Sequence, residues 1–176
     1  GGAGGAAPDR NRRCIPIPDA PRYRTRDVIR GGCDVVQTAV TASRSGEAVA
    51  VNNLGASVTV LDSEALEQRQ TRIVSDILRD VPGVAVSRTG AAGGLTQLRL
   101  RGSEGNHVLV LIDGIEASDP YFGEFDFATL IADPEARVEV LRGQQSSLYG
   151  SDAIGGVIQY LTLTGKEAPG VSLRAE

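Results

Sequence analysis

Short runs of aliphatic and β-branched residues, each bounded by polar or glycine-containing turns, dominate the hydrophobic pattern of this chain. Runs of about five such residues are typical of β-strands rather than of helices. Residues 97–101 alternate between polar and apolar side chains, whereas residues 108–112 are aliphatic throughout, which predicts a buried strand. The predicted strands are 57–61, 84–86, 97–101, 106–115 with an Asp-Gly turn at its end, 138–141 and 157–163.

Two short helices are predicted between the first two strands. Asp62 or Ser63 can cap a helix that runs to about residue 70, and Thr71 can cap the next one. In the second helix Ile73, Val74, Ile77 and Leu78 fall on one face, and Pro82-Gly83 ends it. Strands and helices together predict an α+β fold, a small mixed β-sheet with short helices.

Residues 137–164 join two apolar strands through a small polar turn, and Gly155-Gly156 opens the second strand. Two successive glycines indicate a bulge or a backbone that closely approaches another surface, because no Cβ is tolerated there. We therefore expect a strand–turn–strand unit that packs against something outside itself.

Length and charge restrict the class of protein. The 176 residues suggest one domain, and a net charge of -4 with a pI near 5.1 argues against nucleic-acid binding. The longest aliphatic run, 108–112, is far shorter than the roughly 20 residues of a membrane helix. With 3 Phe, 4 Tyr and no Trp, the chain has too few aromatic residues for the girdles of a transmembrane barrel.

Residues 1–33 are rich in Gly, Pro and Arg and form a leader that we expect to be disordered or non-native. Cys14 and Cys33 lie in it, and a disulfide between them is allowed but not required. A zinc site is not expected, since His107 is the one histidine and lies far from both cysteines in the sequence. We predict no metal and no cofactor.

The motifs at 139–143 (EVLRG) and 149–158 (YGSDAIGGVI) carry a resemblance to a known family. In order and spacing they resemble the plug domain of TonB-dependent outer-membrane receptors. The motifs at 78–84, 100–102 and 108–114 are similar to further plug motifs, whereas residues 159–163 (QYLTL) depart from the usual continuation. The resemblance covers about residues 36–165.

The resemblance implies a plug that gates the energy-dependent import of a scarce, bulky nutrient. In the family the plug is lodged inside a barrel in the cell outer membrane and faces the periplasm. Its partners are the C-terminal domain of TonB, its own barrel and the nutrient. The motifs look closest to cobalamin transporters, followed by ferric siderophore and haem receptors. The expected domains are 34–52, a TonB-box-like segment and linker, 53–165, the plug, and 166–176, the start of a link to a barrel that this chain does not include.

Residues 34–42 alternate short β-forming side chains in a polar setting, and an exposed extended segment of this kind can add a strand to a partner's sheet. They resemble the TonB box, which lies just upstream of the plug. The residues predicted to bind TonB are Thr38, Ala39, Val40, Thr41 and Ala42.

Two loops are expected to face the substrate by resemblance. Residues 90–94 are glycine-rich, and an alternating strand follows them, which excludes a phosphate-binding loop. Residues 116–126 are acidic and contain an aromatic pair; calcium binding or paired catalytic carboxylates are conceivable there, although the spacing does not fit an EF-hand. The predicted substrate-contacting residues are Arg88, Gly90, Gly93, Ser118, Asp119, Tyr121 and Phe122.

Arg101 and Arg142 each precede a glycine at the end of an apolar strand. An unpaired guanidinium is costly to bury and is suited to carboxylates. By resemblance the two arginines pair with glutamates of the inner barrel wall; without a barrel they are expected to be exposed or to pair with local acids such as Glu139.

Two other classes of function are weighed beside the plug. One is a stand-alone periplasmic binding or adaptor domain that docks partners by strand addition. The other is an enzyme that uses Asp113, Asp119 or Glu124 with His107. Because the sequence has no nucleophile elbow, metal-ligand cluster or phosphate loop, we predict that the chain is not an enzyme.

Overall fold

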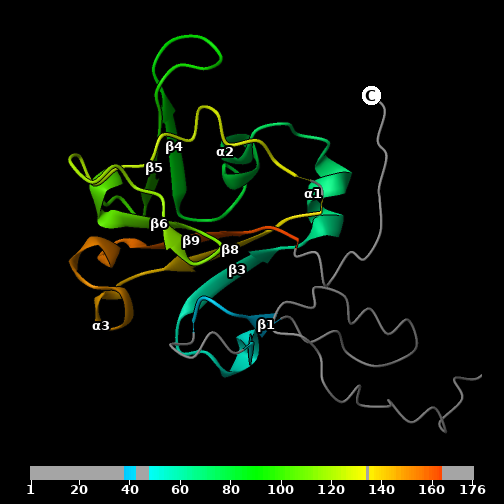
Figure 1. The fold of residues 1–176 in the computed structure, drawn as a ribbon. Helices are drawn as coiled ribbons and strands as arrows, with labels where there is room; N and C mark the ends of the chain where they lie inside the picture. The colour runs from blue at the N-terminus through cyan, green and yellow to red at the C-terminus, as the bar shows by residue number, and fades with distance from the viewer. Residues whose placement is uncertain (1–37, 43–47, 134, 164–176) are drawn as a thin grey trace, which may run out of the picture.

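The computed structural model describes residues 38–42, 48–133 and 135–163, and the sheet at its centre has five strands in the order β3-β8-β9-β6-β7 (Figure 1). Strands β6 and β9 run parallel, whereas the other neighbouring strands are antiparallel. The bounds are β3, Ser57–Leu61; β6, Val108–Ile112; β7, Ile115–Glu116; β8, Arg137–Arg142; and β9, Gly156–Leu161. The predicted small mixed sheet with short helices is confirmed.

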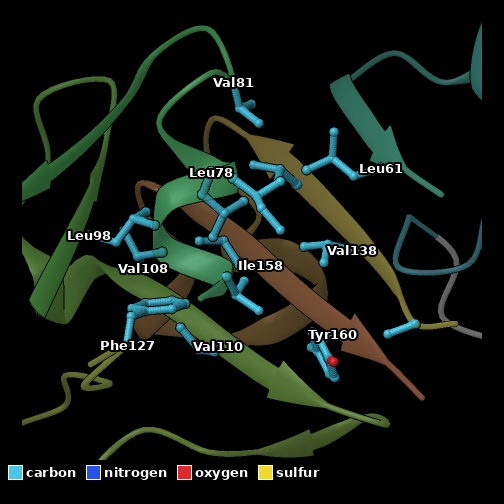
Figure 2. Packing of buried hydrophobic residues seen from close by; sticks show 14 of the residues in the cluster. Leu61, Leu78, Val81, Leu98, Val108, Val110, Phe127, Val138, Ile158 and Tyr160 are labelled. Carbon is cyan, nitrogen blue, oxygen red and sulfur yellow. The ribbon is translucent and has the colours of Figure 1, made fainter. Parts of the chain in front are cut away.

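Two short helices and a hairpin cover one face of the sheet (Figure 1). They are α1, Ser63–Arg69, α2, Val74–Leu78, and the hairpin of β4, Val84–Arg88, with β5, Thr96–Leu100. Figure 2 shows how Leu78 and Leu98 from this layer meet Val138 and Ile158 from the sheet. These buried side chains form the main hydrophobic core.

A second, smaller cluster packs on the opposite face of the sheet. Its buried members include Leu109, Leu141 and Val157, and Tyr149 and Ala42 pack against them. The covering elements are α3, Ser146–Tyr149, and η3, Ser151–Ala153, together with the first described residues of the chain. Since β6, β8 and β9 are covered on both faces, their sequences are nearly continuous apolar runs instead of alternating ones.

The remaining described elements are short. Strands β1, Thr38–Ala39, and β2, Val49–Ala50, form a separate antiparallel pair. The 3-10 helix η1, Val51–Asn53, precedes β3, and η2, Gly105–His107, precedes β6.

The two predicted helix caps have different outcomes. Asp62 caps α1 as predicted, because its Oδ1 accepts the N–H of Ala65 at 3.0 Å. The predicted cap by Thr71 is wrong: α2 follows Ile73 without a side-chain cap, and the Thr71 hydroxyl donates to the Arg69 carbonyl instead. Helix α2 ends at Leu78, one turn before Pro82.

The close approach at the double glycine is internal to the domain. A Cβ on Gly156, which has a φ of 149°, would overlap the Leu141 carbonyl oxygen, and a Cβ on Gly155 would overlap Ser103 Oγ. The expected packing of residues 137–164 against something outside that unit takes place within the domain, where β8 pairs with β3 and β9 pairs with β6.

Several expectations fall on residues that the structure does not describe, namely the leader 1–33 with Cys14 and Cys33, and the link 166–176. The domain boundaries stay predictions. Within the described ranges, no helix has the length and hydrophobicity that a membrane crossing requires.

Candidate functional site

Residues 38–42, which we call the docked segment, lie against the sheet in the layer of the second cluster. Ala39 is 0% exposed, Val40 5% and Thr41 1%. The sequence predicted an exposed extended segment at this place, and that prediction of exposure is wrong. The chain pairs as a strand with β2 only through Thr38 and Ala39; it bends at Val40 and turns at Thr41 and Ala42.

Glu139, in the middle of β8, holds the docked segment through its carboxylate. Oε2 accepts the backbone N–H of Val40 at 2.9 Å and that of Thr41 at 2.8 Å. Oε1 lies 3.1 Å from the same Val40 nitrogen. The Thr41 hydroxyl is 2.6 Å from Glu139 Oε2 and 2.7 Å from Gln159 Oε1, so its one proton has two acceptors. A fully buried carboxylate thus finds most of its acceptor capacity in this short segment.

Arg137 and Tyr149 complete this polar cluster. Arg137 Nη2 lies 2.8 Å from Glu139 Oε1, which balances the buried charge, although the N–H is not aligned with that oxygen as a hydrogen bond. The Tyr149 hydroxyl donates to the Thr41 carbonyl at 2.6 Å. Burial raises the pKa of Tyr149 above its ordinary value of 10.0, and the nearby Glu139 carboxylate raises it further. The phenol therefore stays protonated and able to donate.

Arg101 and Arg142, which are far apart in the sequence, meet at the corner formed by Pro82 and Gly83. Arg142 donates to the Pro82 carbonyl at 2.8 Å and to Thr59 Oγ1 at 2.9 Å. The Cγ of Arg101 and the Cδ of Arg142 lie 3.5 and 3.9 Å from the position of a Cβ on Gly83. Arg101 is exposed, at a φ of 52°, and its guanidinium has no acidic partner among the described residues.

The expected pairing of Arg142 with Glu139 is wrong. Side chains of a strand alternate between its two faces, and three positions separate these residues on β8. Glu139 therefore points to the face of the docked segment, where Arg137 pairs with it. Arg142 points to the face of Thr59 and the main core.

The two predicted substrate loops, 90–94 and 116–126, are joined at their bases. The N–H of Thr96, where the first loop enters β5, donates to Asp126 Oδ1 at 2.9 Å. The side chain of Gln97 donates to Glu124 Oε2, and the N–H of Phe127 donates to the Thr96 carbonyl at 3.0 Å. The structure therefore brings the two loops to one end of the β4–β5 hairpin, although their predicted site residues are distant in sequence.

The second loop presents an aromatic pair to the outside. Asp119 Oδ1 accepts the N–H groups of Tyr121 and Phe122, each at 2.8 Å, and this closes a tight turn. The two rings pack edge to face with centroids 5.0 Å apart. Tyr121 is 86% exposed and Phe122 is 70% exposed. Because Asp119 uses one carboxylate oxygen on its own loop, it shapes the turn that carries these rings. Ser118 lies nearby in the same loop and is partly buried.

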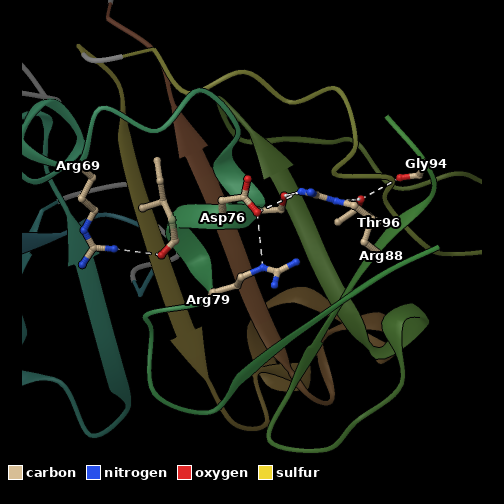
Figure 3. Close-up of polar contacts among 8 residues, drawn as sticks. Arg69, Asp76, Arg79, Arg88, Gly94 and Thr96 are labelled. Carbon is tan, nitrogen blue, oxygen red and sulfur yellow. Dashed lines mark hydrogen bonds and ion pairs between the residues drawn. The ribbon is translucent and has the colours of Figure 1, made fainter. Parts of the chain in front are cut away.

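Arg88 anchors the base of the first loop (Figure 3). From the end of β4 it reaches Asp76 on α2, with Nη2 3.1 Å from Oδ1, and Asp76 also contacts Arg79 Nε at 3.5 Å. Arg88 Nε donates to Thr96 Oγ1 at 3.4 Å. Gly90 and Gly93 lie in the exposed part of the loop with positive φ values of 85° and 87°. The Arg88 guanidinium is therefore occupied by contacts within the domain.

The acidic residues considered for catalysis or metal binding have separate structural roles. Asp113 accepts the N–H and the hydroxyl of Thr162 at 2.8 and 2.7 Å. The His107 carbonyl accepts the N–H of Gly155 at 2.8 Å. Across the described part of the chain, no group of three or more His, Cys, Asp or Glu side chains is placed to hold a metal ion.

Sequence reasoning missed the residues that receive the docked segment. It considered Glu139 only as a motif residue and as a possible partner of the two arginines, treated Tyr149 only as part of a motif, and assigned no role to Gln159. One signal was present: Glu139 and Gln159 are polar residues inside otherwise apolar strand runs, and they are cross-strand neighbours in the sheet. A polar pair at buried strand positions indicates that something polar must cover it.

A family comparison assigns this mixed sheet, with its docked segment and two joined loops, to the class of receptor plugs. The family model described as the TonB-dependent Receptor Plug Domain matches residues 50–157, more than half of the chain. The chain therefore belongs to the TonB-dependent receptor plug domain family. This is a family of receptors rather than of enzymes.

Solved structures support the same fold. A double mutant of the ferric enterobactin receptor PfeA from Pseudomonas aeruginosa is 28% identical, with a TM-score of 0.51, and the match covers 62% of this chain and 18% of that one. The siderophore receptor PiuA from Acinetobacter baumannii is 24% identical, with a TM-score of 0.56, over 74% of this chain and 17% of that one. The ferripyoverdine receptor of the Pseudomonas aeruginosa outer membrane is 23% identical, with a TM-score of 0.58, over 73% and 16%. This chain spans less than a fifth of the length of these receptors.

Proposed function

We propose that this chain is the plug of an outer-membrane receptor that imports a bulky iron chelate of the siderophore class with energy from TonB. The family match and the likeness to the ferric enterobactin receptor support this proposal. The exposed pair Tyr121–Phe122 supports the proposed ligand binding. Large aromatic rings that are exposed to solvent on a hydrogen-bonded turn are typical of a binding surface. Cobalamin and haem, which the sequence analysis also considered, are the alternative ligands in the test.

The paired loops supply the ligand-facing surface in this proposal. Hydrogen bonds from Thr96 and Gln97 hold the base of the aromatic loop, while Arg88 holds the base of the glycine loop. Both loops are therefore fixed at their bases and exposed at their tips. Such loops can bind a large solute without a rearrangement of the sheet. Gly90 and Gly93 allow the first loop a close backbone approach to such a solute.

The ligand test uses the receptor that contains this plug. Its binding of ferric enterobactin, ferripyoverdine, cobalamin and haem is measured by isothermal titration calorimetry. Tyr121→Ala with Phe122→Ala is expected to weaken binding of one iron chelate by about 10-fold or more, the range of an aromatic contact residue. Ile131→Ala is the matched control, because Ile131 is equally apolar and 71% exposed but bridges to Ile73 beside α2. Tightest binding of cobalamin or haem would contradict the siderophore class.

For the partner, we propose that residues 38–42 add a strand to the C-terminal domain of TonB. The segment contains three β-branched residues and precedes the matched family region. Titration of the chain with the TonB domain is expected to show binding that Val40→Pro abolishes and Val40→Ala preserves, because only proline lacks the backbone donor. Since Val40→Pro also removes a hydrogen bond to Glu139, it can only loosen the docked segment, so a loss of binding reports lost strand pairing. Equal binding by the proline variant would place the TonB-binding segment elsewhere.

For Arg101 and Arg142, we propose contacts with acidic groups of the receptor wall that surrounds a plug. Arg101 supports this most directly, because it is exposed and none of the described acidic side chains pairs with it. Arg142 is partly buried and already donates to Pro82 and Thr59, so it supports the proposal less directly. One further carboxylate could accept from both guanidinium groups at this corner.

A further inference from the structure

We propose that the surface formed by the two loops selects an uncharged or cationic iron chelate of the hydroxamate type over the anionic chelates that catecholates form. This inference rests on the function proposed above and adds the charge class of its ligand. An iron(III) complex saturated with catecholates keeps excess negative charge, whereas one saturated with hydroxamates is neutral. The side chains around Tyr121 and Phe122 distinguish these two classes by charge.

The balance of charge on this surface is negative. Residues 102–107 lie beside the aromatic loop, because the Cβ of Asn106 is 3.5 Å from the position of a Cβ on Gly123. Together with the loops 90–94 and 116–126 they contain no arginine or lysine, and their five acidic residues are Glu104, Glu116, Asp119, Glu124 and Asp126. On the face of β5 that carries Gln97, the exposed Arg99 adds one basic side chain. An anionic ligand therefore meets more carboxylates than guanidinium groups here.

Two further arginines near the loops in sequence do not change this balance. Arg88 beside the glycine loop pairs with Asp76 on α2 at 3.1 Å, which compensates its charge. Arg101 follows Leu100, which pairs with β4 at the end of the hairpin opposite to the loops, and its side chain lies beside Gly83. Neither guanidinium is presented at the tips of the loops.

The acidic side chains keep their negative charge because their hydrogen-bond donors are neutral. Asp119 and Asp126 each accept two backbone N–H groups. Glu124 accepts the side-chain amide of Gln97. Such donors orient a carboxylate without cancelling its charge. The ion pairs that the structure describes include none of these three acids, nor Glu104.

The rest of the surface favours the same class of ligand. The face of an aromatic ring carries partial negative charge and attracts cations. Tyr121 and Phe122 touch edge to face and are 86% and 70% exposed, so ring faces remain accessible to a ligand. The glycine loop has only uncharged side chains, and its Thr89 and Gly94 N–H groups donate within the loop itself. Neither loop presents a positively charged donor to an anionic chelate.

The first measurement determines the charge of the surface without any ligand. A cationic and an anionic nitroxide, amino-TEMPO and carboxy-TEMPO, are added in turn to the 176-residue chain. Paramagnetic relaxation of the amides of Tyr121, Phe122 and Gly123 is then compared by NMR. We expect the cationic nitroxide to relax them about 2- to 5-fold more strongly, since a negative surface concentrates cations.

The variants reverse one charge at matched exposed positions. Glu104→Lys changes the charge beside the aromatic loop, and Glu104 is suited to this because it precedes η2 without a side-chain cap. Glu135→Lys is the control, since Glu135 is also exposed but lies beyond the far end of β9. The length of β9 is about 16 Å, which exceeds the screening length of about 8 Å at physiological salt. Glu104→Lys should lower the ratio of the two relaxation effects, and Glu135→Lys should leave it unchanged.

The second measurement uses the receptor that contains this plug and titration calorimetry. Its ligands are ferric enterobactin, which is anionic, ferrichrome, a neutral hydroxamate chelate, and ferrioxamine B, a cationic one. We expect a hydroxamate chelate to bind at least about 10-fold more tightly than ferric enterobactin, and Glu104→Lys to narrow the difference by about 3- to 10-fold. The affinity for ferrichrome should change by less than about 2-fold, because a neutral ligand responds little to one charge.

Stronger relaxation by the anionic nitroxide, or tightest binding of ferric enterobactin by the unchanged receptor, would overturn the inference. An unchanged affinity difference in Glu104→Lys would overturn it too, because the charge beside the loops would then not control selection. If the receptor binds no iron chelate while the cationic nitroxide is favoured, the proposed siderophore class fails and the charge preference of the surface stands. The two failures are therefore distinguishable.

Discussion

Arg137 and Glu139 lie two positions apart on one face of β8, with Nη2 2.8 Å from Oε1, and both side chains are almost completely buried. Removing one member of such a pair leaves an uncompensated charge in the interior. We expect Glu139→Ala to lower the free energy of unfolding by about 3–5 kcal/mol, measured by urea denaturation. Glu116→Ala, at an exposed position of β7, is the control and should change it by less than about 0.5 kcal/mol.

The double variant Arg137→Met with Glu139→Leu separates stability from docking. Replacing both charges by apolar side chains is expected to restore most of the free energy of unfolding, because neither charge is then left alone. The amides of Val40 and Thr41 should still exchange faster than in the unchanged chain, since their acceptor is gone. A double variant as unstable as Glu139→Ala would show that the carboxylate stabilises the fold by more than charge balance.

Gly156 is expected to tolerate no side chain. Its φ is 149°, and a Cβ there would overlap the Leu141 carbonyl oxygen and crowd Leu100. Gly156→Ala should lower the free energy of unfolding by more than about 3 kcal/mol through overlap and backbone strain. Gly55→Ala is the matched control, because a Cβ on Gly55 meets nothing within 4 Å. Thermal denaturation of both variants checks the difference, and equal melting temperatures would contradict it.

Arg88 is expected to order the glycine loop rather than to act as an isolated ligand contact. Arg88→Ala removes the link from β4 to Asp76 and Thr96 and should cost about 1 kcal/mol, since the pair is only partly buried. Amide exchange in residues 89–95 should accelerate while exchange in β6 and β9 does not. Arg99→Ala, which removes an exposed arginine from the same hairpin, should leave the loop unchanged.

Tyr160 makes stability depend on alkaline pH. Burial raises the pKa of Tyr160 above its ordinary value of 10.0, and the hydrogen bond from the Asp133 N–H lowers it by less. A phenol with a raised folded-state pKa contributes stability that is complete below about pH 10 and is lost as the pH rises through that folded value. Tyr160→Phe should therefore lose stability at neutral pH, because two hydrogen bonds disappear, but show a shallower decline above pH 10. Circular dichroism measures the stability of both proteins across this pH range. An identical decline of stability in the two proteins would contradict the prediction.

Most of the sheet could be predicted from the sequence because its strands are short, β-branched and separated by clear turn signals. Strand β3 matches its prediction residue for residue, and β6 lies within the strand that was predicted over 106–115. The predicted cap by Thr71 is wrong because Ile73, just before α2, forms a β-bridge with Ile131 that no local pattern indicates. The close backbone approach at Gly155 and Gly156 was predicted, but its neighbours Ser103 and Leu141 were not, because a glycine indicates that space is scarce without indicating which residue occupies it.

The candidate site was predicted less well because its contacts connect distant parts of the chain. Local reading identified residues 38–42 as a β-forming segment but placed them in solvent, whereas a carboxylate 99 positions away binds Val40. It selected Arg88 because this residue precedes a loop, but it did not predict the ion pair of Arg88 with Asp76 on α2. The sequence placed Tyr121 and Phe122 as an aromatic pair on a loop, and in the structure both rings are exposed on a turn closed by Asp119. The sequence predicted features that depend on neighbouring residues, but it did not predict which distant residues pair with the charged side chains.

The order of the chain determines how the domain would respond to mechanical tension applied at its N-terminal side. From residue 38 the chain runs through β2 and η1 into β3, which is an edge strand that pairs only with β8 in the sheet. We expect a pull to break the side-chain contacts of Glu139 first. It would then peel β3 from β8 pair by pair, starting at Ser57 and Arg142, while β6, β8 and β9 keep their ladders. Tension applied on this side would therefore open the sheet from its β3 edge and leave the central strands paired.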